Sequence, residues 1–502
     1  MKATEAADFV VVGSGAAGAS VAVALAEAGC DVALLEEGPE VRDDDRGLGP
    51  TEALMRLFRD RGTQVSMGKS VIPVLQGRCL GGSTVVNGAI VWRLPEDAYE
   101  RCFGLAGARD EIPLREIEQR MDRIERDLSI AATPDSRIGK NGLLMRAGSN
   151  KLGWRGHAMV RNVADCQGSG RCLEGCPTRR KQSMEVTYLP RARGLGARVF
   201  ADHEVRRVEM RGDVAAGVSG TRADGTRFRF EARRGVVLAA SAIQTPCILA
   251  RSRLGGREHV GAHLMCHPGT AVAGIYREPV ELWNGATQSY EVDEFRDAGF
   301  KMEVIGLPLE LAGVRLPGLG AELAKNLADY GHMAVWAVQV RAEAEGSVAP
   351  AIGGTRIVYT PTSRDMERFR EGVKRLCEMH FAAGAVRVYP GVHGGPTLLR
   401  SMDEVRKLDQ LSLDPRAYSL LISHVFGTCR MARTADAGAI DFHGAVRGVR
   451  GLWVVDASVF PKNLGVNPQH TIMALAMLLA ERIGLHEASA RSSRTSTNQA
   501  SM

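Results

Sequence analysis

A glycine motif near the start of the chain has the spacing of a dinucleotide-binding turn. Gly13, Gly15 and Gly18 follow a run of β-branched residues in the pattern G-x-G-x-x-G. The first glycine permits a tight turn, the second lets the backbone approach a pyrophosphate, and the third allows close helix–strand packing. Glu36 ends the next apolar run, where a carboxylate can accept hydrogen bonds from ribose hydroxyls. The motif predicts a dinucleotide site that includes Ala16 at the helix start; NAD and FAD share this pattern.

Three of the ten cysteines form a cluster: Cys166, Cys172 and Cys176. In a reducing compartment such a cluster indicates a metal or redox site before it indicates a disulfide. The spacing is not the C-x2-C-x2-C run of ferredoxins, and three thiolates suit a three-iron cluster or a cubane with one open corner. Three reduced thiols, or one disulfide and one thiol, are the alternative. Zinc is disfavoured because the nearest further ligand, His157, lies well upstream.

The elements that must position these residues alternate between strand and helix. A buried strand at 9–12, a helix of small residues at 19–28 and a strand at 31–35 make one βαβ unit. Apolar periodicity and capping residues predict further helices at 113–128, 362–384 and 469–483, the last one ending at Gly484. Other apolar runs predict strands within 197–240 and at 333–340, 355–360 and 451–455.

Four stretches of the chain resemble the glucose–methanol–choline (GMC) flavoprotein oxidoreductases. They are Val11–Gly38, Gly77–Arg93, Val260–Pro268 and His424–Ile483, and they follow the family's order from end to end. The resemblance implies FAD as the cofactor. It also implies an α/β fold, in which a Rossmann-like FAD-binding domain carries an inserted α+β substrate domain built on an antiparallel sheet.

We therefore expect a discontinuous domain organisation. The FAD-binding domain is predicted to comprise residues 1–95, 160–270 and 425–484, and the substrate domain residues 96–159 and 271–424. Residues 485–502, rich in Ser, Thr, Ala and Arg, are expected to form a disordered tail.

The resemblance also assigns residues to the flavin. The loop residues Gly81, Gly82, Ser83 and Asn87 match the segment that runs along the flavin. Val205 matches the position whose backbone meets the adenine, Asp456 matches the residue near the pyrophosphate and ribityl chain, and Asn467-Pro468 opens the helix whose positive end faces the pyrimidine side. Ser241 stands where the family usually has glycine.

His424 and Asn467 match the two family positions that face the flavin ring. Oxidising an alcohol removes a hydroxyl proton and a carbon-bound hydride. A histidine can accept the proton near neutral pH, and the flavin N5 accepts the hydride. An asparagine can hold the substrate oxygen but cannot take a proton. We expect His424 to be the base and Asn467 the orienting residue, with His470 a core or supporting residue.

The cysteine loop resembles two groups within the family. In bacterial FAD-dependent sugar dehydrogenases a similar loop holds an iron–sulfur cluster that passes electrons to a cytochrome-like partner, in company with a small chaperone subunit. In the long-chain alcohol oxidases a cluster is not implied. Electrons are therefore expected to leave either to dioxygen or through a cluster, such as 3Fe-4S, to an acceptor protein.

Composition excludes several classes of protein. The net charge of +6 over 502 residues is small and aromatic residues are sparse at 5%, so no nucleic-acid partner is expected. No apolar run is long enough to predict a membrane span. No signal pattern precedes Phe9, so we expect a cytoplasmic protein, with export beside a signal-bearing subunit as the alternative.

The expected activity is FAD-dependent oxidation of a small-molecule alcohol to a carbonyl. The alternatives are non-oxidative chemistry on the same scaffold, an electron-transfer subunit without its own substrate, and a nicotinamide dehydrogenase. The leucines between 307 and 319 are expected to pack in a core rather than to contact a substrate. If they line the substrate pocket, they indicate a hydrophobic alcohol.

Overall fold

The computed structural model describes residues 5–313 and 315–499, and side chains up to residue 485. Its first sheet has seven strands in the order β8-β2-β1-β11-β10-β9, with β20 beside β11. Strands β1, β2, β8, β11 and β20 run parallel, whereas β9 and β10 are antiparallel additions. The bounds are β1 (Glu5–Val12), β2 (Val32–Leu35), β8 (Arg198–Phe200), β9 (His203–Arg211), β10 (Val214–Arg222), β11 (Arg227–Leu238) and β20 (Leu452–Val454).

The second sheet has nine strands and is antiparallel throughout. Its order is β17-β16-β12-β15-β14-β13-β6, and β18 and β19 also pair with β12. The bounds are β6 (Gly156–Ala158), β12 (Leu264–Ile275), β13 (Tyr290–Val292), β14 (Phe300–Val304), β15 (Met333–Val340), β16 (Glu345–Ala351), β17 (Gly354–Val358), β18 (Arg387–Tyr389) and β19 (Leu421–Phe426). Two short ribbons complete the strands: β3 (Val65–Ser66) with β4 (Ile72–Pro73), and β5 (Ile130–Ala132) with β7 (Val160–Asn162).

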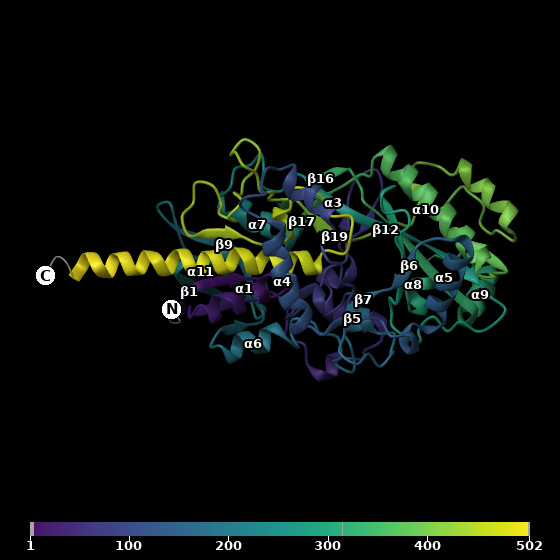
Figure 1. Ribbon diagram of the computed structural model, residues 1–502, viewed down its shortest axis with the longest axis horizontal. Coiled ribbons are helices and arrows are strands. Elements are labelled where there is room, and N and C mark those ends of the chain that lie inside the picture. The colour runs from purple at the N-terminus through teal and green to yellow at the C-terminus, as the bar shows by residue number, and fades with distance from the viewer. Residues whose placement is uncertain (1–4, 314, 500–502) are drawn as a thin grey trace.

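Helices cover both sheets. In Figure 1 the long helix α11 lies along α1 and α4 beside the first sheet, while α5, α9 and α10 lie at the far end with the second sheet. The helices are α1 (Ala16–Glu27), α2 (Pro50–Leu57), α3 (Glu96–Tyr99), α4 (Leu114–Asp127), α5 (Gly139–Leu152), α6 (Tyr188–Gly194), α7 (Ser241–Ser252), α8 (Leu309–Gly313), α9 (Ala321–Ala328), α10 (Ser363–Ala382) and α11 (Gln469–Gln499). Each sheet has its own large hydrophobic core.

The predicted fold class is confirmed: a parallel α/β layer carries a second domain built on an antiparallel sheet. Helix α10 begins at the predicted cap, where Thr362 and Asp365 form a reciprocal capping box. The domain boundaries drawn from the sequence stay a prediction. No helix within residues 5–313 and 315–499 is long and apolar enough to span a bilayer.

The structure differs from the prediction at the end of α11. The helix continues through Gly484 to Gln499, where the sequence predicts a stop and a disordered tail; residues 500–502 lie outside the described range. A Cβ added at Gly484 would lie 3.3 Å from the Ala28 Cβ. Gly484 therefore allows α11 to approach the end of α1 closely, and a glycine in that role does not end a helix.

Candidate active site

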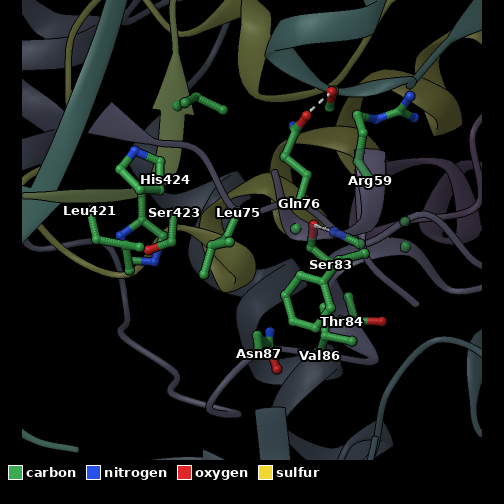
Figure 2. A pocket seen from close by; sticks show the side chains of 18 of the residues that line it. Arg59, Leu75, Gln76, Ser83, Thr84, Val86, Asn87, Leu421, Ser423 and His424 are labelled. Carbon is green, nitrogen blue, oxygen red and sulfur yellow. Dashed lines mark hydrogen bonds between the residues drawn. The ribbon is translucent and has the colours of Figure 1, made fainter. Parts of the chain in front are cut away.

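One large cavity of about 900 Å³ joins the two domains. Its walls come from the glycine turn after β1, the loop 75–90, the start of α7, strands β12, β14, β15 and β19, and the start of α11. In Figure 2, Ser83, Thr84, Val86 and Asn87 gather on one side of the hollow, and His424, Ser423 and Leu421 lie on another. Segments from both ends of the chain thus meet around one space.

The glycine turn has the close contacts that its spacing predicts. Gly13 has a φ of +97°, and an added Cβ would lie 2.5 Å from the Ala239 carbonyl oxygen. A Cβ at Gly18 would lie 1.8 Å from the Gly13 oxygen, so only glycine lets α1 start this close to β1. A Cβ at Gly15 would meet nothing within 4 Å, and Gly15 caps α1 without a side chain. Gly15, Ala16 and Ala17 at this helix end line the large cavity, as a phosphate site at a helix start requires.

Glu36 ties the glycine turn to its neighbours. Its carboxylate accepts hydrogen bonds from the Ser14 amide (3.0 Å), the Ser14 hydroxyl (2.7 Å) and the Gly38 amide (2.9 Å). Burial raises the pKa of Glu36, and these hydrogen bonds offset part of the rise. The Ser14 hydroxyl in turn accepts from the Gly81 amide at 2.9 Å. Glu36 lines the cavity while it also fixes the turn and the loop that carries Gly81.

Asp456 has a structural task beside the cavity. Its buried carboxylate accepts hydrogen bonds from the Ser241 amide (3.0 Å), the Thr245 hydroxyl (2.5 Å) and the Ser458 amide (2.8 Å). These bonds cap the short helix Ala457–Val459 and hold the first turn of α7. Burial raises the pKa of Asp456 despite these donors.

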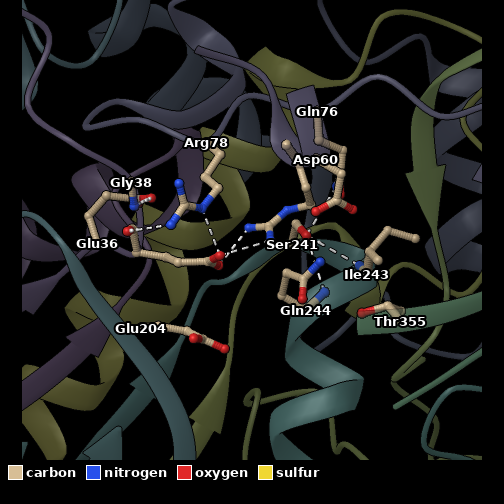
Figure 3. A network of polar contacts seen from close by, with 12 residues as sticks. Glu36, Gly38, Asp60, Gln76, Arg78, Glu204, Ser241, Ile243, Gln244 and Thr355 are labelled. Atoms are coloured by element: carbon tan, nitrogen blue, oxygen red, sulfur yellow. Dashed lines mark hydrogen bonds and ion pairs between the residues drawn. The ribbon is translucent and has the colours of Figure 1, made fainter. Parts of the chain in front are cut away.

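Ser241 has a φ of +85° at the first position of α7, a region of backbone space that favours glycine. Its hydroxyl accepts hydrogen bonds from Gln76 Nε2 (3.2 Å) and the Ile243 amide (3.2 Å). The left-handed backbone explains physically why a glycine would suit this position. Figure 3 shows Ser241 and Gln244 at one side of the polar network that also contains Arg78 and Glu36.

Side-chain hydrogen bonds join the start of α11 to the loop 75–90. Asn87 Nδ2 donates to Gln469 Oε1 at 2.6 Å, and Asn87 Oδ1 accepts from the Ala89 amide at 3.0 Å. Asn467 is 6% exposed, and its Oδ1 accepts a hydrogen bond from the buried Lys301 at 2.7 Å. Both asparagines line the cavity, and both have their carbonyl oxygens engaged.

His424 lies on β19 at a bulge. Cys266 pairs with Val425 and Pro268 with Ile422, so Ser423 and His424 lie opposite the single residue His267 of β12. A bulge of this kind re-aims side chains, and here it brings the two imidazoles together. Their rings stack at 5.3 Å between centroids, and the two Nδ1 atoms are 3.2 Å apart.

The environment keeps both imidazoles neutral. Burial lowers the pKa of His424 to about 3, with a second contribution from the positive charge of Lys301. Burial and the neighbouring His424 lower the pKa of His267 well below its usual value. His267 Nε2 has no hydrogen-bond partner in the described part of the chain. A neutral His424 that lines the cavity can serve as a proton acceptor.

The three clustered cysteines are all free thiols, and they line a separate small cavity of about 10 Å³. Arg161 Nη2 donates to the Cys172 sulfur at 3.0 Å, and Arg161 Nη1 lies 3.7 Å from the Cys166 sulfur. Burial would raise the pKa of Cys172, but Arg161 and Lys181 lower it overall. A space this small holds about one water molecule, and no His, Cys, Asp or Glu triplet in the described ranges is arranged around a metal. The thiols as placed do not fit an iron–sulfur cluster.

Most of the sequence-predicted residues converge on the large cavity. Those that line it are Gly13, Gly15, Ala16, Glu36, Gly82, Ser83, Asn87, Val205, His424, Asp456, Asn467 and Pro468. Gly18 and Gly81 lie behind the wall, where they support it. His470 is buried away from the cavity, with its Nε2 3.2 Å from the Met121 carbonyl oxygen in α4.

Sequence reasoning missed four residues around the site: His267, Gln288, Lys301 and Glu303. His267 lies inside a stretch that resembles the family, next to Pro268, so its position carried a usable signal. Gln288, Lys301 and Glu303 lie in the variable middle of the chain. They gave no signal, because Glu303 meets Glu291 of β13 and Gln288 just before it only when β13 pairs with β14.

Comparisons with known proteins agree with this geometry. Models of the GMC oxidoreductase family match residues 7–269 and 339–476. An uncharacterized GMC-type oxidoreductase of Mycobacterium tuberculosis is 36% identical over 482 residues, covering 95% of this chain and 75% of that protein. The long-chain-alcohol oxidase FAO4B of Arabidopsis thaliana is 27% identical, covering 95% of this chain and 67% of that protein. A formate oxidase of Aspergillus oryzae superimposes with a TM-score of 0.74 at 16% identity, covering 97% and 100% of the two chains.

The chain belongs to the GMC oxidoreductase family, and it is an FAD-dependent oxidoreductase. The residues present fit the cofactor: the glycine cradle, the start of α1 and the 900 Å³ cavity together provide its space and its phosphate donors. Family membership thereby resolves the choice between NAD and FAD that the glycine motif left open.

Proposed function

We propose that this protein oxidises the CH–OH group of an alcohol to a carbonyl, with His424 as the proton acceptor. The observation that carries the proposal is the neutral imidazole of His424, which shares one cavity with the glycine cradle and the start of α11. When bound, FAD supplies the acceptor for the hydride that leaves the alcohol carbon.

His267 supports the proposed base through its contact with His424. Two Nδ1 atoms 3.2 Å apart share one proton, so one ring is the donor and the other the acceptor. If His424 donates from Nδ1 to His267, its Nε2 has a free lone pair for the alcohol proton. After proton transfer the same hydrogen bond stabilises the charged ring. We assign this tautomer because the opposite one would leave a proton on His424 Nε2.

Asn467 is proposed to hold the alcohol oxygen. Its carbonyl oxygen accepts from Lys301 and its amide also hydrogen-bonds Glu303, so one amide N–H remains to serve a substrate. We further propose that Gly13, Gly15, Gly82 and Val205 contact FAD by their backbone, and that Ser83, Asn87 and Pro468 lie along its ring system.

The proposed substrate is an apolar alcohol. Ile305, Leu307, Leu311, Leu420 and Leu421 line the part of the cavity nearest the second sheet. Leu316 is buried in the core of the second sheet and Leu319 is 88% exposed, so only part of the leucine-rich segment faces the cavity. The relatives named long-chain-alcohol oxidases agree with an apolar pocket.

Dioxygen is the proposed electron acceptor, since two of the three thiols that would hold a cluster contact Arg161 and the third, Cys176, contacts Thr178. The alternative, a relay to a protein acceptor through a cluster, needs those thiols to rearrange. A subunit without its own substrate would not need His424.

The test is anaerobic reduction of the holoenzyme by a series of primary alkanols, followed by flavin absorbance. We expect H424N to slow the reduction by about 10²-fold to 10⁴-fold, the usual contribution of a general base. Reduction by dithionite should be unchanged in the same variant, and the surface variant H393N should behave as wild type. Reduction of H424N by alkanol at the wild-type rate would refute the assignment.

A further inference from the structure

A buried group of charges lies behind the cavity wall. Lys301 of β14 is 1% exposed in its side chain, and it touches Glu291 of β13 and Glu303 of β14, which are 2% and 0% exposed. Glu291 and Glu303 face each other directly across the two strands. Two carboxylates at such positions repel unless a cation lies between them, and burial makes that pairing obligatory.

The three N–H bonds of the Lys301 ammonium have three partners. Nζ donates to Glu291 Oε2 at 3.0 Å, to Glu303, and to Asn467 Oδ1 at 2.7 Å. Trp92 adds a ring face 5.2 Å from Nζ. An ammonium has no fourth donor, so Asn467 occupies one of its fixed directions.

The carboxylates are held in turn by further hydrogen-bond partners. Gln288 Nε2 donates to Glu303 at 3.0 Å, and Trp92 Nε1 donates to Glu291 at 3.0 Å. His157 Nε2 lies 3.2 Å from Glu291. Lys301, Glu291 and Glu303 each have several hydrogen-bond partners. Lys301 therefore cannot shift without breaking several buried contacts.

We propose that Lys301 is a positioning residue for the oxidation. It holds the carbonyl oxygen of Asn467, whose amide lines the cavity and also hydrogen-bonds Glu303, and so fixes the orientation of the one N–H left for the alcohol oxygen. Its positive charge behind the amide strengthens that N–H as a donor to the alcohol oxygen, which gains negative charge as His424 takes the proton. This inference rests on the proposed alcohol oxidation, because it assigns Lys301 a part in the same step.

The positive charge of Lys301 also affects the pKa of His424, the proposed base. Lys301 contributes to the lowered pKa of His424, and it is also among the groups that lower the pKa of His267. The charged or titratable groups that face His424 are His267 on β12 and Lys301 on β14, and Lys301 in turn pairs with Glu303 on β14 and Glu291 on β13. Arg341, after β15, acts on His267. Loss of the lysine charge removes a cation from this set, so it should raise the pKa of His424.

The experiment compares K301M with the triple variant E291Q/K301M/E303Q, which removes all three buried charges and so avoids an unpaired carboxylate. K374M is the matched control: it breaks the ion pair between Lys374 on α10 and Asp409 in the short helix Met402–Gln410. We expect both Lys301 variants to bind FAD and to be reduced by alkanol about 10²-fold more slowly, with alcohol affinity changed less than about threefold. K374M should match wild type.

Histidine-labelled NMR titration gives the second readout, with His424 assigned by its loss in H424N. We expect the His424 pKa to rise in K301M and to stay at its wild-type value in K374M. If alkanols reduce both Lys301 variants at the wild-type rate, the positioning role is refuted while the proposed function stands. If alkanols fail to reduce the wild-type flavin at all, the proposed function fails. Independently, an unchanged His424 pKa in K301M would refute the effect of the Lys301 charge on His424.

Discussion

At the scale of single residues, the reactive imidazole depends on a partner that is itself uncharged. In many catalytic triads a carboxylate orients the base and stabilises its charged form. Here the partner is His267, a neutral ring with 1% exposure. A neutral acceptor stabilises an imidazolium less than a carboxylate does, so it offsets little of the burial and of the Lys301 charge that lower the His424 pKa to about 3.

The His267 contact gives a prediction with a matched pair of variants. H267N keeps a side-chain oxygen that can accept from His424 Nδ1, whereas H267L removes the acceptor. We expect H267L to reduce the rate of flavin reduction by alkanol by about 10²-fold, and H267N to lose much less. Stopped-flow absorbance measures both rates. Equal rates for the two variants would show that the tautomer of His424 does not depend on position 267.

Ser241 carries a second residue-scale prediction, on stability. S241A keeps the positive φ of 85° and loses the hydroxyl acceptor, whereas S241G loses the hydroxyl but relieves the backbone. We expect S241G to have a free energy of unfolding about 1 kcal/mol higher than S241A. Chemical denaturation of the two holoproteins measures the difference. An S241A variant as stable as S241G would mean that the left-handed backbone is not strained.

At the scale of elements, the loop after β2 is fastened by ion pairs. Glu37 pairs with Arg59 at 2.7 Å and with Arg78 at 2.9 Å, which ties this loop to the segments around β3 and β4. Burial alone would raise the pKa of Glu37, but the charges and hydrogen bonds of both arginines lower it to about 2. Figure 3 shows Arg78 beside Glu36 and Gly38 in this network.

This lowered pKa predicts how stability depends on pH. A carboxyl with a folded pKa below its unfolded value stabilises the fold above the unfolded pKa, and that contribution is lost as pH falls toward the folded pKa. Between about pH 4.5 and pH 2, wild type should therefore lose up to about 3 kcal/mol more stability than E37Q. Urea unfolding at a series of pH values measures both proteins. Parallel pH dependences would contradict the role given to Glu37.

At the scale of elements, features set by local sequence spacing could be predicted, whereas features set by tertiary pairing could not. The glycine turn, the capped α10 and the apolar start of α11 follow from local spacing, so they could be predicted. The Lys301 cluster could not, because Glu291 and Glu303 meet only through the register of β13 on β14. The continuation of α11 past Gly484 was missed for a similar reason: a glycine that serves helix packing looks like a helix stop in the sequence.

At the scale of the whole molecule, the cysteine loop that contains Cys172 is linked to the loop 75–90 that lines the large cavity. Lys181 is 1% exposed and donates to the backbone oxygens of Val85, Asn87 and Cys172. The loop that lines the cavity and the cysteine loop therefore share one buried ammonium. Such a link would suit electron transfer if a cluster were held there, and it equally suits a purely structural brace.

Peroxide yield and iron content distinguish a structural cysteine loop, with dioxygen as the acceptor, from a cysteine loop that holds a cluster. If dioxygen is the acceptor, aerobic turnover of an alkanol should yield one hydrogen peroxide per carbonyl, and anaerobically purified protein should contain no stoichiometric iron or acid-labile sulfide. C166S/C176S is the informative variant, because it removes two of the three sulfurs while Cys172 keeps its contact with Arg161. We expect this variant to retain wild-type peroxide formation, since neither thiol touches the large cavity. About three irons per chain, together with loss of dye reduction but intact flavin bleaching in C166S/C176S, would instead establish a cluster as the outlet. The thiols would then have to move apart from Arg161 when iron binds, because their present cavity holds no more than a water molecule.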